Sequence, residues 1–209
     1  MSEQDQIVFI VDDDEDIRSS LSRALTKRGY NVKSFESADV FLNAYDPDQS
    51  GCLVLDYGMP GMNGLQLQER LAQKDYLLPI IFITGHGGVP ESVQAIKAGA
   101  IDFLEKPFRQ SLLLEHIDAA LKEDQKARAS RARMNSVHAR VDTLTKREWE
   151  IAHMMAQDSS NTSSKQIGLS LNISPRTVDH HRARILEKMQ VASVAELVHL
   201  LITAGLVSK

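Results

Sequence analysis

Five polar side chains stand at or just beyond the ends of short apolar runs: Asp12, Asp13, Asp56, Thr84 and Lys106. An apolar run bounded by turn residues indicates a buried parallel strand, and parallel strands bring their carboxyl ends to one edge of a sheet. Carboxylates that meet there raise one another's pKa, a penalty that a hard cation such as Mg²⁺ removes. Acids, a hydroxyl and an ammonium at one edge predict a site for a transferred phosphoryl group.

The elements that would position these side chains alternate between strand and helix patterns through residues 1–120. Apolar or alternating runs predict strands at residues 7–11, 32–35, 52–56, 79–84 and 101–104. Apolar residues at helical spacing predict helices around residues 17–25, 40–44, 65–71, 93–97 and 113–121. Five strand–helix units of this length predict an α/β fold whose parallel sheet is covered by helices on both faces.

The stretch from Lys122 to Arg140 contains good helix formers and many basic residues but neither Gly nor Pro. Nothing in it stops the preceding helix, so the composition predicts a helical linker, which we expect to fray near Asn135 and Ser136. A flexible linker is the alternative interpretation of the same stretch.

Helix-start signals divide the last part of the chain into four helices. Thr145-x-x-Glu148 and Ser193-x-x-Glu196 are capping boxes, and Ser174-Pro175 places a proline in a first helical turn. Asn172 supplies the turn before the third helix, so the second and third helices predict a helix-turn-helix. The third helix would enter the major groove of DNA, with arginines around it at the phosphates. On charge pattern alone, an ordinary solvated helix face is the alternative.

Charge is unevenly distributed along the chain. Residues 1–120 contain 10 Lys and Arg against 19 Asp and Glu, whereas residues 121–209 contain 14 against 9. This asymmetry indicates an acidic half that handles a metal or phosphate and a basic half able to approach a polyanion. We find no apolar run that could span a membrane and no secretion signal. The single cysteine, Cys52, fits a reducing cytoplasm.

The first 120 residues resemble the receiver domains of response regulators, and their motif sequences are closest to those of the FixJ branch. The motifs that carry the resemblance are Val11-Asp12-Asp13, Leu55-Asp56, Met59 to Gly64, Ile83 to Gly87 and Asp102 to Phe108. The resemblance implies a flavodoxin-like (βα)₅ fold, and it implies that a sensor histidine kinase is the phosphate donor.

Several residues acquire roles through this resemblance. Asp56 would be the phosphoacceptor, Lys106 would contact the phosphoryl group, Thr84 would be the switch hydroxyl and Phe103 the switch aromatic. Mg²⁺ would be held by four groups, the carboxylates of Asp12, Asp13 and Asp56 and the backbone carbonyl of Gly58. Many family members carry a bulky side chain at the position of Gly58, so the family's rate of autodephosphorylation does not carry over to this chain.

Residues 142–207 resemble the LuxR/FixJ type of DNA-binding domain, through the motifs Leu144-Thr145-x-Arg147-Glu148, Lys165-Gln166-Ile167 and Ile173 to Met189. The implied DNA-contacting residues of the third helix are Arg176, Thr177, His180, Arg182, Arg184 and Lys188. Among them, Thr177 and His180 are candidates for base contacts. The chain departs from the family pattern in a longer segment at 157–163 that lacks Gly. It also carries Asp179 where some relatives carry a DNA-contacting Lys.

These features predict a phosphorylation-controlled, DNA-binding transcription regulator of a two-component system, located in the cytoplasm and not an enzyme. We expect a receiver at residues 1–121, a helical linker at 122–141 and a four-helix DNA-binding domain at 142–209. The expected partners are a sensor histidine kinase, double-stranded DNA and, on phosphorylation, a second copy of the chain, with no membrane contact.

Two alternatives belong to other functional classes. One keeps the receiver but makes the C-terminal domain a protein-interaction module, for which the altered loop and Asp179 are the grounds. The other is a phosphate-metabolising enzyme similar to the haloacid-dehalogenase-like phosphatases. Those enzymes carry Asp-x-Asp after their first strand, whereas this chain has Asp56-Tyr57-Gly58 after the third.

Overall fold

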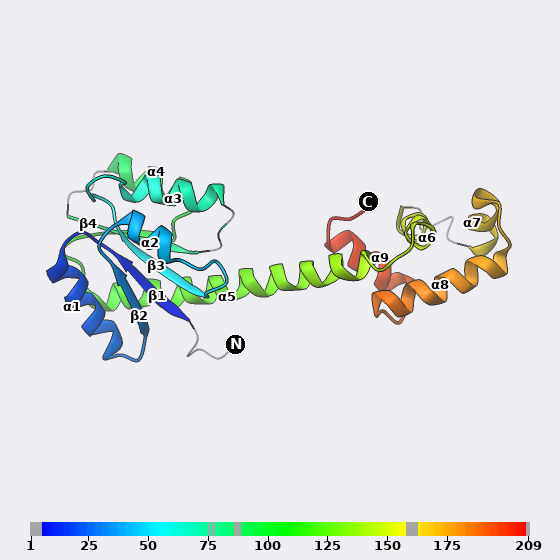
Figure 1. Cartoon of the computed structure of the whole chain (residues 1–209), viewed down its shortest axis with the longest axis horizontal. Helices are drawn as coiled ribbons and strands as arrows, with labels where there is room; N and C mark the ends of the chain where they lie inside the picture. Colours follow the sequence, from blue (N-terminus) through cyan, green and yellow to red (C-terminus); the bar gives the residue numbers. More distant parts are fainter. Residues whose placement is uncertain (1–5, 75, 77, 86–88, 158–162, 208–209) are drawn as a thin grey trace. The chain divides into compact units, whose positions relative to one another are not determined.

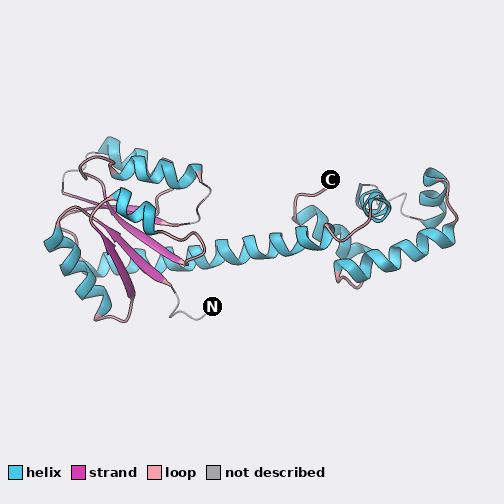
Figure 2. Cartoon of the chain, in the orientation of Figure 1, coloured by secondary structure: helices cyan, strands magenta, loops and turns pink. Residues whose placement is uncertain are grey.

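The chain divides after Ala129 into two units, each with its own apolar core. The computed structural model describes residues 6–74, 76, 78–85, 89–157 and 163–207. Two features singled out in the sequence, the segment at His86 and most of the loop at 157–163, lie outside the described residues. The first unit combines strands and helices, while the described part of the second contains helices without strands (Figure 1, Figure 2).

The first unit follows the predicted alternation of strands and helices. Its elements are, in chain order, β1 (Ile7–Val11), α1 (Glu15–Thr26), β2 (Asn31–Phe35), α2 (Ala38–Ala44), β3 (Gly51–Asp56), α3 (Gly64–Gln73), β4 (Ile80–Thr84), α4 (Val89–Lys97), β5 (Asp102–Glu105) and α5 (Gln110–Val141). Gly29 and Gly99, shortly after the ends of α1 and α4, both have φ of +92°, a left-handed conformation that does not continue a helix.

The five strands pair in parallel in the order β2-β1-β3-β4-β5. Successive residues of a strand point to opposite faces of the sheet. On one face Phe9, Leu53 and Phe82 pack under α2, α3 and α4. On the other face Val8 and Val54 pack with residues of α1 and α5 (Figure 1). The predicted parallel sheet with helices on both faces is therefore confirmed.

The register of β1 and β3 determines which side chains meet at the carboxyl edge. Both strands lie in the interior of the sheet, and every residue in them is buried. Val11 is the register partner of Leu55, so the next residues, Asp12 and Asp56, are neighbours where the two strands end. After β5 the chain passes through a cis peptide bond between Lys106 and Pro107.

Helix α5 is continuous from Gln110 to Val141, so the predicted fraying near Asn135 and Ser136 is wrong. The reason is tertiary packing, because Val137 is only 3% exposed and lies in the core of the second unit. The sparse apolar residues of this stretch gave no sign of that core, since its other members lie on later helices. No helix in the described part of the chain, α5 included, is long and apolar enough to cross a bilayer.

The beginning of the predicted linker packs against the first unit. Asp124 is fully buried, and its carboxylate accepts hydrogen bonds from three groups, the Ser50 hydroxyl, the Gly51 N–H and the Arg128 guanidinium. Arg128 also donates to two backbone carbonyls of the loop before β3, at 2.9 and 2.7 Å. A buried carboxylate is tolerated only when it is paired and hydrogen-bonded. These contacts therefore anchor α5 to the amino end of β3.

The second unit contains the four helices predicted from their start signals. They are α6 (Lys146–Gln157), α7 (Ser164–Leu171), α8 (Pro175–Met189) and α9 (Val194–Thr203). Each helix contributes to one apolar core, in which Ile151, Ile167, Val178 and Leu197 are completely buried. These apolar residues therefore form the inner faces of the four helices.

Two residues shape the turn between α7 and α8. Asn172 adopts a left-handed conformation with φ of 53° and ends α7. A Cβ atom on Gly168 would stand 2.7 Å from the carbonyl oxygen of Ile173, so only glycine lets the turn approach the helix this closely. Helix α8 then begins at the predicted cap, where the Ser174 side chain accepts a hydrogen bond from the Thr177 N–H.

Candidate functional site

Asp12 and Asp56, neighbours at the carboxyl edge of the sheet, are joined by a lysine. Both residues are buried, with exposures of 1% and 7%. The ammonium of Lys106, which follows β5, lies 2.9 Å from Asp12 Oδ2 and 2.8 Å from Asp56 Oδ1. The structure thus brings together three of the residues that the sequence predicted to meet at this edge.

The charges at this edge are not fully balanced, because one ammonium faces two carboxylates. Burial raises the pKa of Asp12 above its ordinary value, although the hydrogen bond from Lys106 opposes this effect. Burial also disfavours the charged form of Lys106, but its bonds to Asp56 and Asp12 outweigh this and raise its pKa. Since burial still penalises the Asp12 anion, further positive charge beside it would be stabilising.

Backbone groups hold both carboxylates in place. Asp12 Oδ1 accepts a hydrogen bond from the Asp14 N–H, and Asp56 Oδ2 accepts one from the Gly58 N–H, both at 2.9 Å. Asp14 itself is the N-cap of α1, where its side chain accepts hydrogen bonds from the Asp16 and Ile17 N–H groups. Arg18 donates to the Asp12 carbonyl oxygen at 2.7 Å. The sequence gave no sign of this contact, since it depends on how α1 is rotated against the sheet.

Thr84 and Phe103 occupy the neighbouring strands β4 and β5. Thr84 is 2% exposed, and its carbonyl oxygen accepts a hydrogen bond from the Lys106 N–H at 2.7 Å. The Phe103 ring is half-buried, with its centre 5.9 Å from that of Tyr57 and 6.0 Å from that of Phe82. Thr84 therefore lies at the edge that carries Lys106, while Phe103 packs in an aromatic cluster beside it.

The acids at this edge fit a hard divalent cation. Asp13 is exposed next to buried Asp12, and both offer oxygen donors. Among the residues that the structure describes, no three His, Cys, Asp or Glu side chains lie close enough together to form a metal site alone. Mg²⁺ is usually held by one or two carboxylates, with water and phosphate oxygens at its other positions. The incompletely compensated charge of Asp12 and this donor set suit Mg²⁺.

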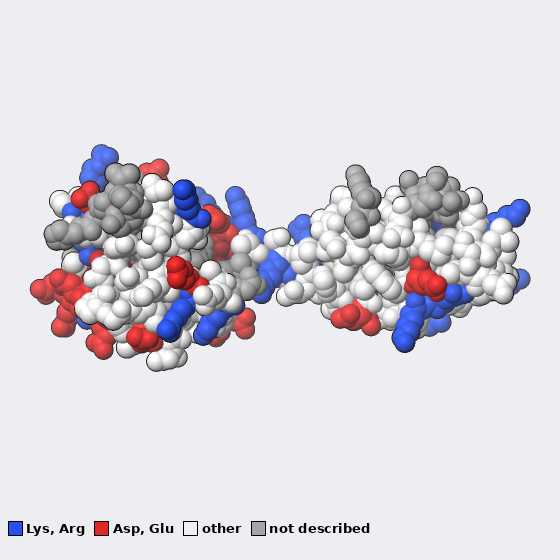
Figure 3. All heavy atoms as spheres, turned by 90° about the horizontal axis from the view of Figure 1, so that it is seen from above, with Lys and Arg blue, Asp and Glu red and all other residues white. Residues whose placement is uncertain are grey.

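The outward face of α8 carries most of the residues predicted to contact DNA. Arg176, Thr177 and His180 are exposed, and the Arg184 side chain is 54% exposed. Thr177 is engaged by the start of its own helix, because its hydroxyl lies 2.7 Å from Ser174 Oγ. Figure 3 shows both basic and acidic side chains on the surface of the second unit. Because Arg176, Asp179 and Arg184 are all exposed on α8, this face is polar and of mixed charge.

Arg182 is tied to the start of α7. Its guanidinium donates to Ser164 Oγ at 3.0 Å, and the Ser164 hydroxyl donates in turn to Asp179 Oδ1. Ser164 is the first residue of α7, so this chain of bonds joins the two helices of the turn. The sequence gave no indication that Ser164 joins the two helices, because its partners lie 15 and 18 positions away.

Lys188 and Arg184 face a buried carboxylate. Glu148, near the start of α6, is 1% exposed and lies 2.6 Å from Lys188 Nζ and 3.6 Å from Arg184 Nε. Its carboxylate also accepts a hydrogen bond from the Thr145 N–H, while the Glu148 N–H donates to the Thr145 hydroxyl. The predicted capping box is confirmed, and Lys188, whose side chain is still 26% exposed, forms an ion pair with this buried carboxylate.

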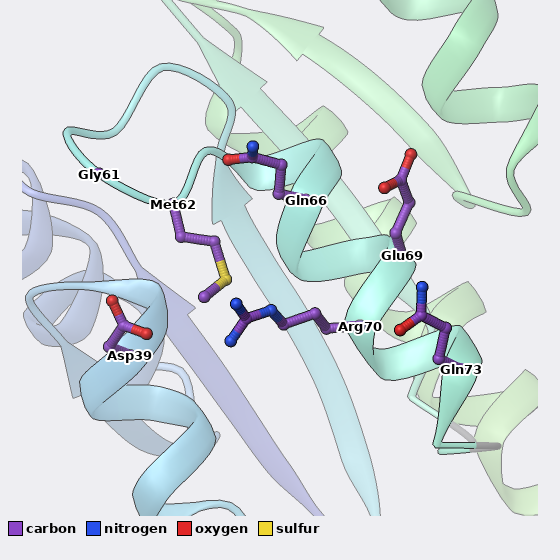
Figure 4. Close-up of a pocket in the computed structure, with 7 residues that line it drawn as sticks. All are labelled: Asp39, Gly61, Met62, Gln66, Glu69, Arg70 and Gln73. Atoms are coloured by element: carbon purple, nitrogen blue, oxygen red, sulfur yellow. The ribbon is translucent and has the colours of Figure 1, made fainter.

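A groove of about 500 Å³ between α2 and α3 contains none of the residues predicted to do chemistry. It is lined by Asp39, Gly61, Met62, Gln66, Glu69, Arg70 and Gln73. Figure 4 shows Met62 and Arg70 extending toward the gap, with Asp39 on the α2 side. The groove is thus separate from the site at Asp12, Asp56 and Lys106.

Two family models match the chain. One, described as the response regulator receiver domain, matches residues 8–118, and the other, described as bacterial regulatory proteins of the luxR family, matches residues 142–201. The response regulator protein TmoT of Ectopseudomonas mendocina is 43% identical over 198 residues, which are 95% of this chain and 89% of TmoT. The transcriptional regulatory protein FixJ of Rhizobium meliloti is 42% identical over 202 residues, 96% of this chain and 97% of FixJ.

Solved structures of response regulators are also similar to this chain. The structure of the response regulator StyR is 40% identical, with a TM-score of 0.86 over 95% of this chain and 98% of StyR. The structure of FixJ-N is 46% identical, with a TM-score of 0.53, and it covers 58% of this chain and 96% of its own. Relatives that match nearly the whole chain therefore contain both of its units.

We expect acid to destabilise the second unit through Glu148. Burial disfavours its ionised form, but the hydrogen bonds from Lys188 and Thr145 outweigh this and lower the pKa of Glu148 from 4.5 to about 2. A carboxyl whose pKa is lowered by folding contributes stability that is complete above its unfolded pKa and is lost as the pH falls through its folded pKa. The difference corresponds to on the order of 3 kcal/mol, lost between pH 4.5 and 2.

Urea unfolding of the full chain, followed by the fluorescence of Trp149, measures this stability, because the chain's single tryptophan lies in the second unit. Glu148→Gln should be less stable at neutral pH and should lose less stability on acidification. Glu150→Gln is the matched control, since Glu150 is 49% exposed and pairs with Arg147 at the surface. A Glu148→Gln variant with the wild-type pH dependence would contradict the prediction.

Proposed function

Because the chain belongs to the response regulators, with a receiver domain followed by a LuxR-type DNA-binding domain, we propose that it acts through Asp56 and the exposed face of α8. It is a phosphorylation-controlled, DNA-binding transcription regulator of a two-component system. The observation that carries the residue assignment is the Lys106 bridge between Asp12 and Asp56. We assign residues 1–121 to the receiver, 122–141 to a helical linker and 142–209 to the DNA-binding domain.

The surroundings of Asp56 suit phosphoryl transfer from a phosphohistidine of a sensor kinase. A carboxylate oxygen of Asp56 forms a bond to phosphorus while the P–N bond breaks, and the histidine side chain leaves. Lys106, 2.8 Å from Asp56, offsets the negative charge of the transferred group, and the Thr84 hydroxyl binds one of its oxygens. A Cβ atom at Gly58 would lie 3.8 Å from Asp56 Oδ2, so glycine leaves the approach to this oxygen open.

Receiver domains bind Mg²⁺ at the phosphorylation site. In this chain we assign its binding to Asp12, Asp13, Asp56 and the backbone carbonyl of Gly58. When bound, the cation supplies positive charge to the phosphoryl oxygens and removes the repulsion among the carboxylates. The raised pKa of buried Asp12 supports this assignment, since that carboxylate lacks sufficient compensating charge without it.

Phosphorylation should require the carboxylate of Asp56. With acetyl phosphate and Mg²⁺, the wild-type chain should gain the mass of one phosphoryl group, and Asp56→Asn should not, because an amide is a far weaker nucleophile. Intact-mass spectrometry measures the change. Asp16→Asn is the matched control, since Asp16 is an exposed acid in the first turn of α1 and should not alter labelling. Undiminished labelling of Asp56→Asn would place the acceptor elsewhere.

We propose that α8 enters the major groove of double-stranded DNA, with Thr177 and His180 toward the bases and Arg176 and Arg184 toward phosphates. Their exposure on one helix supports this assignment. Arg182 and Lys188 complete the set of proposed DNA contacts, and each also has a structural role. Arg182 also holds α8 to α7 through Ser164, and Lys188 also neutralises Glu148.

Loss of an exposed phosphate contact should change the salt dependence of DNA binding. Arg176→Ala should reduce the slope of log K against log salt by about 1, because one fewer counterion is released. Fluorescence anisotropy of a labelled operator fragment over a series of salt concentrations measures the slope. Arg23→Ala, an equal charge change on exposed α1, should leave it unaltered. An unchanged slope in Arg176→Ala would remove Arg176 from the interface.

We further propose that phosphorylation acts through Thr84 and Phe103 on the face formed by α4, β5 and α5, from Val89 to Lys122. This face would then pair with its copy on a second chain. Val93 and Ile96, each 44% exposed, line a shallow surface pocket together with Phe103, which supports an apolar contact there. A symmetric pair suits a two-fold operator read by two helix-turn-helix domains.

The mass of the chain should double when the phosphorylated state is mimicked by beryllofluoride, and Ile96→Glu should prevent the doubling by placing a charge in the apolar contact. Light scattering with and without beryllofluoride measures the mass. Val40→Glu is the matched control, because Val40 on α2 is 42% exposed and lies outside this face. Equal mass in both states with identical operator affinity would contradict phosphorylation-driven dimerisation.

The expectations for location and enzymatic activity follow from the proposed DNA partner and from the family. A regulator that binds the chromosome of a bacterium works in the cytoplasm, so we place the chain there. Its family has a regulatory role, and we ascribe to it no turnover of an external substrate. A C-terminal domain that binds another protein in place of DNA would leave the salt series without any operator binding.

A further inference from the structure

The first two turns of α8 present one carboxylate among basic and neutral side chains. Asp179 is exposed and is the fifth residue of the helix. Its Oδ1 accepts a hydrogen bond from the Ser164 hydroxyl, and Ser164 accepts one from Arg182. One oxygen of this exposed acid is therefore fixed by α7, while its exposure leaves the other available for a partner.

We propose that Asp179 reads a base of the operator, with its second carboxylate oxygen accepting a hydrogen bond from the exocyclic amino group of a cytosine in the major groove. This inference rests on the proposed DNA-binding role of α8. It deepens that role by specifying the base required at one position of the half-site, and it adds Ser164 as a positioning residue.

The position of Asp179 in the helix places it among the groups that can reach bases. The residues near the amino end of a recognition helix contact base edges. Within this part of α8, Val178 is completely buried, while Arg176, Thr177 and His180 are exposed beside Asp179. Asp179 is exposed and lies on the side of α8 that meets the start of α7, the helix that crosses the DNA backbone in a helix-turn-helix.

The chemistry of a carboxylate selects the base. An ionised carboxylate accepts hydrogen bonds and donates none. In the major groove guanine offers two acceptors, and thymine offers an acceptor and a methyl group, so neither suits it. Adenine offers a donor beside the acceptor N7, which would repel a carboxylate oxygen, whereas cytosine offers its N4 amino donor alone. Cytosine is therefore the base that matches Asp179.

The hydrogen bonds around Ser164 explain how the negative charge of Asp179 is tolerated on a surface that approaches a polyanion. An isolated carboxylate there would be repelled by phosphates. The Arg182 guanidinium, joined to Asp179 through Ser164, offsets part of that repulsion and limits the rotamers of the acid. A neutral amide could join α7 to α8 equally well, so the need for a helix contact does not by itself explain an acid.

The test is selection of DNA fragments from a random pool by the full chain in beryllofluoride, for the wild type, Asp179→Asn and Ser164→Ala. The wild type should prefer cytosine at one half-site position by about tenfold or more. Asp179→Asn should change that preference to adenine, because an amide pairs with both N6 and N7, and should leave the other positions unaltered. Ser164→Ala should weaken the cytosine preference without changing the base.

Three results would overturn the inference. One is an Asp179→Asn profile identical to that of the wild type, and another is tighter binding to all sequences with no change at any position, which would mean that Asp179 only repels phosphates. The third is a wild type that selects no DNA, which would also refute the DNA-binding function. Asparagine keeps an oxygen acceptor for Ser164, so unfolding followed by Trp149 fluorescence should show wild-type stability in Asp179→Asn.

Discussion

The parallel register of β1 and β3 is the constraint on which the proposed phosphoryl site depends. Because Val11 pairs with Leu55, the two strands end together and Asp12 and Asp56 become neighbours. Close packing on both faces favours this register, since a shift of one residue would exchange Phe9 and Leu53, which pack on one face, with the smaller Val8 and Val54 of the other. Lys106 then stabilises the paired carboxylates from the loop after β5, which completes the edge at which we propose phosphoryl transfer.

A buried carboxylate is stabilised by the same kinds of contact in each unit. Asp124 and Glu148 are completely or almost completely buried, and each receives a backbone N–H together with a basic side chain, Arg128 or Lys188. Both are closed structural sites. The edge at Asp12 differs, because one ammonium is shared by two acids and an exposed Asp13 lies beside them. Among the buried carboxylates that the structure describes, only those at this edge share one basic side chain, so a cation bound there would offset the remaining negative charge.

The two units also differ in the role of their polar contacts. In the first unit, Asp124 and Arg128 bind the start of the linker stretch to the amino end of β3, the strand whose carboxyl end carries Asp56. In the second unit, Ser164 at the start of α7 joins the exposed Asp179 to Arg182. Similar hydrogen-bond chemistry thus anchors a helix in one unit and orients an exposed side chain in the other.

The sequence by itself determined the elements, their order and the identity of the residues at the carboxyl edge. Strand and helix patterns depend on neighbours within a few positions, and caps such as Asp14 and Ser174 act within one turn. The rule that parallel strands end at one edge then placed Asp12, Asp56 and Lys106 together. Only the tertiary structure decided that α5 continues through Val137 and that Ser164 meets Asp179. Those contacts join residues far apart in the chain, and they depend on how each helix is rotated against its neighbours, which local patterns do not encode.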